Sequence, residues 1–89
     1  MNTFSDALEG LKRGELWARD GWNGKGMFVF LVPGSQFQVS RPPLLGIFNE
    51  GTVIDYAPHL DMKLADGRVM TWTPAQIDLL SSDWKRIES

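Results

Sequence analysis

The sequence contains no cysteine, which excludes disulfide bridges and every metal site built on thiolates. It has a single histidine, His59, and no H-E-x-x-H motif, so neither a histidine metal centre nor a paired nucleophile and base is indicated. We therefore expect no catalytic residue, no metal and no cofactor, and we predict that the protein is not an enzyme. The lack of cysteine also fits a cytoplasmic location, which we expect.

Long hydrophobic runs and clusters of like charge are missing as well. No apolar run approaches the ~18 residues of a membrane span, and the first residues lack the pattern of a signal peptide. The net charge is -2, with acidic and basic residues interspersed. Because no basic stripe is present, we expect neither DNA, RNA nor a membrane as a partner. A small phosphorylated ligand is not excluded, since its binding needs only a local positive pocket.

What is present is typical of one globular domain spanning residues 1–89. The hydrophobic content is 43%, and four tryptophans and five phenylalanines stand against one tyrosine. Tryptophan is costly to leave in water and often provides a flat contact surface. A chain of this size buries modest area per residue, so a homo-oligomer is a natural way to bury more.

Residues 3–14 predict an N-terminal helix. Thr3 and Asp6 have capping-box spacing, and Gly14 is a natural end. Strands are predicted at residues 16–20, 27–32, 52–57 and 83–87, with a hairpin over residues 59–72. The strand Met27–Val32 is apolar on both faces and must be covered twice, by the helix and by a neighbouring subunit.

Between these strands, residues 33–51 predict a long connection, interrupted by Pro33-Gly34 and Pro42-Pro43 and containing a helical turn. Residues 73–80 predict a short helix with Thr73 as N-cap, Pro74 first and Gln76 completing the capping box. The predicted fold class is α+β: a small antiparallel sheet with an N-terminal helix and a short C-terminal helix.

The hairpin has Asp66-Gly67 as its expected two-residue turn, which would place Leu64 opposite Val69. Alternation then predicts a core face of Leu60, Met62, Leu64, Val69 and Thr71, and a second face of Asp61, Lys63, Arg68, Met70 and Trp72. The second face is either an ordinary solvated face or a ligand platform. In the platform, the indole would stack on a base, a cation would meet phosphate and the carboxylate a hydroxyl group.

The stretch "GWNGKGM", residues 21–27, allows two interpretations. It is a hairpin loop whose Trp22 folds back onto the core, or it is an anion-binding loop in which Lys25 adds charge to backbone N–H groups. It is not the dinucleotide-binding fingerprint, because no G-x-G-x-x-G is present, and it is not a P-loop, because Lys25 is not followed by Ser or Thr.

Three motifs in order, "GWNGKGM", "DMK.ADG" and "W.P.Q.DLL..DW", resemble the Thoeris anti-defence protein two family of phages and prophages. The opening "F.DAL..L..G" fits as well, and only residues 33–57 lack a pattern to compare. The resemblance implies a sponge that sequesters nucleotide immune messengers without turnover. These are cyclic ADP-ribose isomers and, for some members, cyclic di- or oligonucleotides at a separate site. It also implies homo-oligomers, typically tetramers, with pockets at subunit contacts.

Carried onto this chain, the resemblance implies a ligand pocket formed by Trp22, Asn23, Lys25, Met27, Asp61, Lys63, Trp72 and Gln76. The alternative is a protein-interaction module that inhibits a host protein, in which the exposed aromatic residues contact a partner surface.

Overall fold

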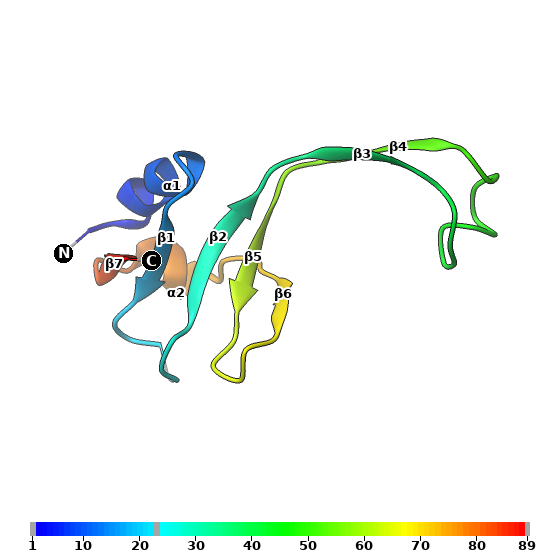
Figure 1. The fold of residues 1–89 in the computed structure, drawn as a ribbon. Helices are drawn as coiled ribbons and strands as arrows, with labels where there is room; N and C mark the ends of the chain where they lie inside the picture. Colours follow the sequence, from blue (N-terminus) through cyan, green and yellow to red (C-terminus); the bar gives the residue numbers. More distant parts are fainter. Residues whose placement is uncertain (1, 23, 89) are drawn as a thin grey trace.

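A computed structural model describes residues 2–22 and 24–88 of the chain. The elements follow in the order α1 (Phe4–Lys12), β1 (Leu16–Arg19), β2 (Phe28–Val32), β3 (Ser35–Gln38), β4 (Val53–Tyr56), β5 (His59–Lys63), β6 (Val69–Thr71), α2 (Gln76–Leu80) and β7 (Trp84–Ile87). Five strands form an antiparallel sheet in the order β6-β5-β2-β1-β7, and β3 and β4 form a second sheet (Figure 1). The predicted α+β class is confirmed.

Helix α1 begins as the sequence predicts. The backbone N–H of Thr3 donates to the Asp6 carboxylate at 3.0 Å, and the N–H of Asp6 donates to the Thr3 hydroxyl at 3.4 Å. This capping box satisfies two N–H groups that the first helical turn leaves unpaired. The helix then buries Ala7 and Leu11 completely.

The core lies between α1 and one face of the five-stranded sheet. Trp17, Val29 and Met62 are neighbours across β1, β2 and β5, so their side chains share that face. Together with Trp84 of β7 they form the buried cluster against the helix. One of the two covers that the apolar strand β2 requires is therefore α1.

The opposite face of the sheet is also apolar. Leu16, Phe28 and Phe30 are half-buried there and line a shallow pocket of about 300 Å³ with Lys63, Gly67 and Val69. The prediction that β2 is apolar on both faces is thus confirmed. A neighbouring subunit as the second cover remains a prediction.

Residues 33–58 form a projection that we call the arm (Figure 1). Strands β3 and β4 pair with each other and belong to a sheet of two strands. The molecule measures 48 × 26 × 26 Å, and its radius of gyration is 15.9 Å. A compact domain of this length would have a radius of about 12 Å. The predicted strand at 52–57 is confirmed as β4, but residues 33–51 are more than a connection, because β3 lies within them.

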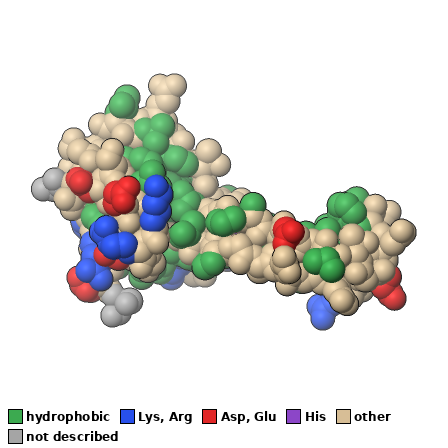
Figure 2. All heavy atoms as spheres, turned by 90° about the horizontal axis from the view of Figure 1, so that it is seen from above, with side chains coloured by type: hydrophobic (Ala, Val, Ile, Leu, Met, Phe, Trp, Pro, Cys, Tyr) green, Lys and Arg blue, Asp and Glu red, His purple; other side chains and the backbone are tan. Residues whose placement is uncertain are grey.

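The arm has one apolar and one polar side. Phe37 faces Ile54 across the ribbon, and Gln36 faces Asp55 in the next pair. Near its far end, Ile47 is 68% exposed. Figure 2 shows hydrophobic side chains on the surface of the arm as well as on the body. An isolated two-stranded ribbon is only marginally stable in water.

The predicted hairpin register is wrong by one residue. Lys63 pairs with Val69 and Met62 with Met70, because the loop contains three residues, 65–67, and not two. The N–H of Leu64 donates to the Arg68 carbonyl at 2.7 Å, and Gly67 adopts φ +94°. A glycine in the left-handed region that closes a three-residue loop is a common alternative to the tight turn.

The shift moves every side chain of β6 to the other face of the sheet. Val69 and Thr71 leave the predicted core face and join Asp61 and Lys63, while Met70 joins Met62. The backbone N–H of Trp72 donates to the Leu60 carbonyl at 2.9 Å. The predicted platform of Asp61, Lys63 and Trp72 on one face is therefore contradicted.

The second helix begins later than predicted. Its N-cap is Ala75 and not Thr73, and Asp78 accepts the N–H of Ala75 at 2.9 Å, so Asp78 takes the role predicted for Gln76. The Asp78 carboxylate also accepts a hydrogen bond from Arg19 at 2.9 Å. No helix in residues 2–22 and 24–88 has the length and apolar character needed to cross a membrane.

Candidate functional site

The glycine-rich segment after β1 forms the loop to β2. Gly24 and Gly26 adopt φ values of +111° and +78°, a region that side chains with a Cβ rarely occupy. The Lys63 ammonium donates to the carbonyl of Gly26 at 3.0 Å and lies 5.4 Å from the centroid of the Phe28 ring. Lys63 therefore holds the end of the loop against β5.

A pocket of about 320 Å³ lies between this loop and the strands β1, β2 and β7. Its lining residues are Ala18, Arg19, Asp20, Trp22, Gly24, Lys25, Gly26, Met27, Phe28, Lys85 and Ile87. Of the predicted site residues, Trp22, Lys25 and Met27 are thus brought together. Asn23 lies outside the described residues.

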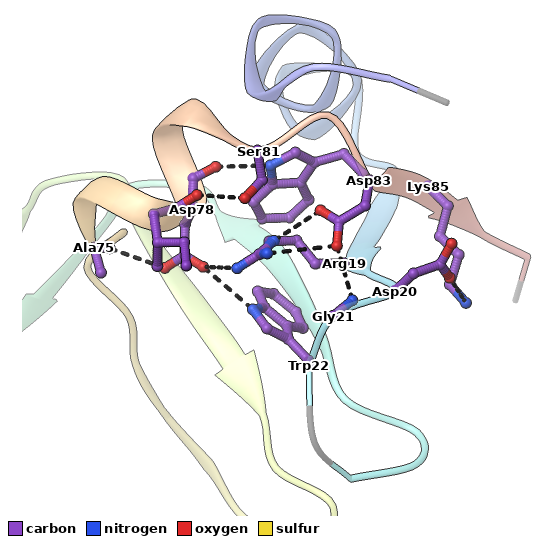
Figure 3. A network of polar contacts seen from close by, with 11 residues as sticks. Arg19, Asp20, Gly21, Trp22, Ala75, Asp78, Ser81, Asp83 and Lys85 are labelled. Atoms are coloured by element: carbon purple, nitrogen blue, oxygen red, sulfur yellow. Dashed lines mark hydrogen bonds and ion pairs between the residues drawn. The ribbon is translucent and has the colours of Figure 1, made fainter.

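An ion-pair network fixes the start of the loop (Figure 3). The guanidinium of Arg19 donates to Asp83 at 2.9 Å and to Asp78 at 2.9 Å, and its side chain is 10% exposed. The backbone N–H of Gly21 donates to the same Asp83 carboxylate at 2.8 Å. One carboxylate therefore binds both the last residue of β1 and the first glycine of the loop.

Trp22 is anchored by its indole N–H, which donates to Asp78 at 3.3 Å. The ring meets Trp84 and Trp72 edge to face, at centroid distances of 5.3 and 6.1 Å. Trp22 is half-buried and packs against the core, as the hairpin-loop interpretation predicts. It also lines the pocket. The anion-binding interpretation of "GWNGKGM" remains a prediction.

The network sets the charge of its two carboxylates. Burial raises the pKa of Asp78, but hydrogen bonds from Ala75, Arg19 and Trp22 outweigh it and leave the pKa below its ordinary value. For Asp83, the hydrogen bond from Arg19 lowers the pKa most, and partial burial opposes it less strongly. Both groups are therefore ionised near neutral pH and neutralise Arg19. The other charged residues that line the pocket are Lys25, Lys85 and Asp20, and Asp20 pairs with Lys85.

The remaining predicted site residues lie apart from this pocket. Trp72 is half-buried in the aromatic cluster with Trp22 and Trp84, and Gln76 is exposed at the first turn of α2. Asp61 lies on the sheet face opposite the aromatic cluster, with its Oδ1 3.5 Å from His59 Nε2. That oxygen is buried and makes no hydrogen bond with the described residues. Trp72 is thus close to Trp22, whereas Asp61 is not near the aromatic cluster.

Sequence reasoning missed five charged residues around the pocket: Arg19, Asp20, Asp78, Asp83 and Lys85. Asp78 and Asp83 stand in the quoted motif "DLL..DW", but the motif assigns them no partner. The pairing of β7 with β1, which places Lys85 opposite Ala18, supplies the missing information. Among residues 2–22 and 24–88, no group of three or more His, Cys, Asp or Glu residues is placed to hold a metal ion.

Residues 2–87 match the family model described as the Thoeris anti-defense 2-like domain. A protein named Thoeris anti-defense 2, from Bacillus phage SP01, is 35% identical over 82 residues, which span 92% of this chain and 90% of that relative. The resemblance inferred from the three motifs is confirmed at the level of the family.

Proposed function

Because the chain belongs to the Thoeris anti-defense 2-like family, we propose that it counters a bacterial defence system by binding a nucleotide messenger and holding it without turnover. Family membership supports the anti-defence role. The proposed ligands are cyclic ADP-ribose isomers, with cyclic di- or oligonucleotides as a further class. Such messengers are made inside the bacterial cell, so the proposed place of action is the host cytoplasm.

The pocket beside the glycine loop is the observation that carries this proposal. It combines an indole wall from Trp22 with the cations Lys25 and Lys85. Aromatic walls suit a base, and ammonium groups suit phosphate. Its volume of about 320 Å³ lies at the small end of the range for ligand pockets. A site of this size fits part of a nucleotide, with the rest held by a second subunit.

A homo-oligomer, with a tetramer as the expected state, is the second part of the proposal. The apolar sheet face around Phe28 and Phe30 and the exposed apolar residues of the arm, such as Ile47, support it. Light scattering coupled to size exclusion measures the mass in solution. Phe30→Ser and Ile47→Ser are expected to lower that mass. A wild-type mass equal to one chain of 10.0 kDa would refute this part.

Sequestration demands tight binding, because one protein removes one messenger. Nanomolar affinity corresponds to about -12 kcal/mol. The direct test is to incubate the protein with a cyclic ADP-ribose isomer, remove free ligand by filtration, denature the complex by heat and identify the released compound. We expect the intact isomer. A cleaved product would assign an enzyme activity instead.

Two variants connect the pocket to binding. Lys25→Ala is expected to weaken the affinity about tenfold, because it removes an exposed cation that lines the pocket. Lys12→Ala in α1 is the matched control, since Lys12 is exposed and pairs with Glu9 far from the loop. Equal affinities of the two variants would remove the pocket from consideration.

The alternative function, a module that inhibits a host protein, is favoured by one observation. Leu80 of α2 is 82% exposed, and Ile77 and Leu79 beside it are 66% and 44% exposed. A thermal-shift screen against cyclic nucleotides separates the two proposals, because a tight ligand raises the melting temperature. No shift with any nucleotide, together with a host protein whose capture is lost in Leu80→Ser, would favour the module.

A further inference from the structure

Lys85 belongs to β7, the last strand in the sequence, yet it lines the pocket beside the glycine loop. Its partner in the β1–β7 ladder is Ala18, so both side chains occupy the same sheet face. Ala18, Lys85 and Ile87 line the pocket opposite the loop that carries Lys25. Two ammonium groups from segments far apart in the sequence thus border one cavity.

The ammonium of Lys85 contacts Asp20 at 2.7 Å, where the side chains are 53% and 46% exposed (Figure 3). Ion pairs this exposed contribute little, because water screens them and both side chains lose freedom. Arg19 differs, because its side chain is only 10% exposed and two carboxylates hold it. Lys85 can therefore exchange its partner at small cost, and Arg19 cannot.

We propose that Lys85 is a ligand-contacting residue that, together with Lys25, binds the phosphate groups of an anionic ligand, and that Asp20 occupies Lys85 until the ligand arrives. This inference rests on the proposed function, which it deepens by assigning the diphosphate to one end of the pocket. Asp20 is then an internal competitor for the ligand. It neutralises the lysine in the free protein and is displaced by a group of higher negative charge.

Inorganic pyrophosphate is the probe, because it carries the diphosphate without base or ribose. Titration calorimetry of the wild type is expected to show binding that Lys85→Ala weakens about tenfold. Asp20→Asn is expected to tighten the same binding several-fold, since the amide no longer competes. Arg86→Ala is the matched control: Arg86 is the next residue of β7, points to the opposite face and contacts Glu15 at 4.0 Å. Its affinity is expected to equal that of the wild type.

The salt dependence gives a second readout. Loss of one cation that binds phosphate reduces the dependence of affinity on salt concentration, which a merely structural role of Lys85 would not do. Lys85→Gln, which keeps the aliphatic stem, must reproduce the loss if Lys85→Ala proves unstable. Pyrophosphate binding that is undetectable in the wild type, or equal in the wild type and both variants, would overturn the inference. Recovery of an intact cyclic ADP-ribose isomer from the wild type tests the proposed function separately.

Discussion

Asp78 and Arg19 are separated by 59 positions in the sequence, yet Oδ1 of the carboxylate and Nη1 of the guanidinium are 2.9 Å apart. Both side chains are 10% exposed. The same carboxylate also accepts the indole N–H of Trp22 and caps α2 at Ala75. One side chain therefore connects β1, the glycine loop and α2.

We expect Asp78→Asn to lower the free energy of unfolding by about 3 kcal/mol, because a buried ion pair loses one charge. The amide oxygen also cannot replace two carboxylate oxygens that serve Ala75, Arg19 and Trp22. Urea denaturation measures the change. The control is Asp20→Asn, an exposed position where a change within about 0.5 kcal/mol is expected. Equal losses in the two variants would contradict the buried connection.

The lowered pKa values of Asp78 and Asp83 predict an acid-dependent stability. Between the folded pKa values and about 3.9, the value of an unfolded aspartate, the unfolded chain binds more protons. Stability is therefore complete above that pH and falls as the pH drops through the folded values. Denaturation midpoints measured from neutral to strongly acidic pH show the slope. A double variant, Asp78→Asn with Asp83→Asn, is expected to flatten it, and an unchanged slope would assign the acid sensitivity elsewhere.

Gly10→Ala tests the close approach of α1 to β1. Helix propensity alone predicts a gain of about 1 kcal/mol. At this position, however, a Cβ would overlap the indole nitrogen of Trp17, which is 5% exposed, and the carboxylate of Glu15. We expect a net loss of about 2 kcal/mol from overpacking. Ser5 lies on the exposed side of the same helix. Ser5→Ala therefore measures the effect of helix propensity on stability where the new side chain meets no clash. A gain in both variants would show that the indole moves freely aside.

Two substitutions at Trp22 separate packing from hydrogen bonding. Trp22→Phe keeps a ring against Trp84 but loses the donor to Asp78, so a loss of about 1 kcal/mol is expected. Trp22→Ala removes the ring as well, and a loss of about 3 kcal/mol is expected. Thermal and urea unfolding measure both. Because Trp22→Ala is expected to destabilise the fold, Trp22→Phe is the better variant for testing ligand binding. Equal stability of the two variants would place the ring outside the core.

The N-terminal helix, the central strand and the last strand were predictable because their signals are local. Thr3 and Asp6 cap the helix as their spacing requires, and β2 has the two apolar faces that its sequence predicts. The register of β5 and β6 was not predictable, because Asp66-Gly67 fits a loop of either two or three residues. The third loop residue places Trp72 on the sheet face that α1 covers. The local sequence pattern does not determine the length of the loop.

The site was predictable only in its loop half. The "GWNGKGM" stretch supplied Trp22, Lys25 and Met27, and these do line one pocket. Lys85 escaped prediction because its role depends on β7 pairing with β1, a contact between the two ends of the chain. Long-range pairing of this kind leaves no periodic trace in the sequence. Asp61 and Gln76 remain predicted ligand-binding residues, but they do not line this pocket.

The ladder between β2 and β5 runs without interruption to its last pair, Val32 with His59. The two strands are thus the stems of a single hairpin, and everything from residue 33 to residue 58 is an insertion at its tip. A two-residue Asn-Gly turn grafted in its place would leave each ladder bond of the larger sheet intact. The length and sequence of this insertion can therefore change without altering the glycine loop. The pocket at the loop and the surface of the arm can accordingly vary independently of each other.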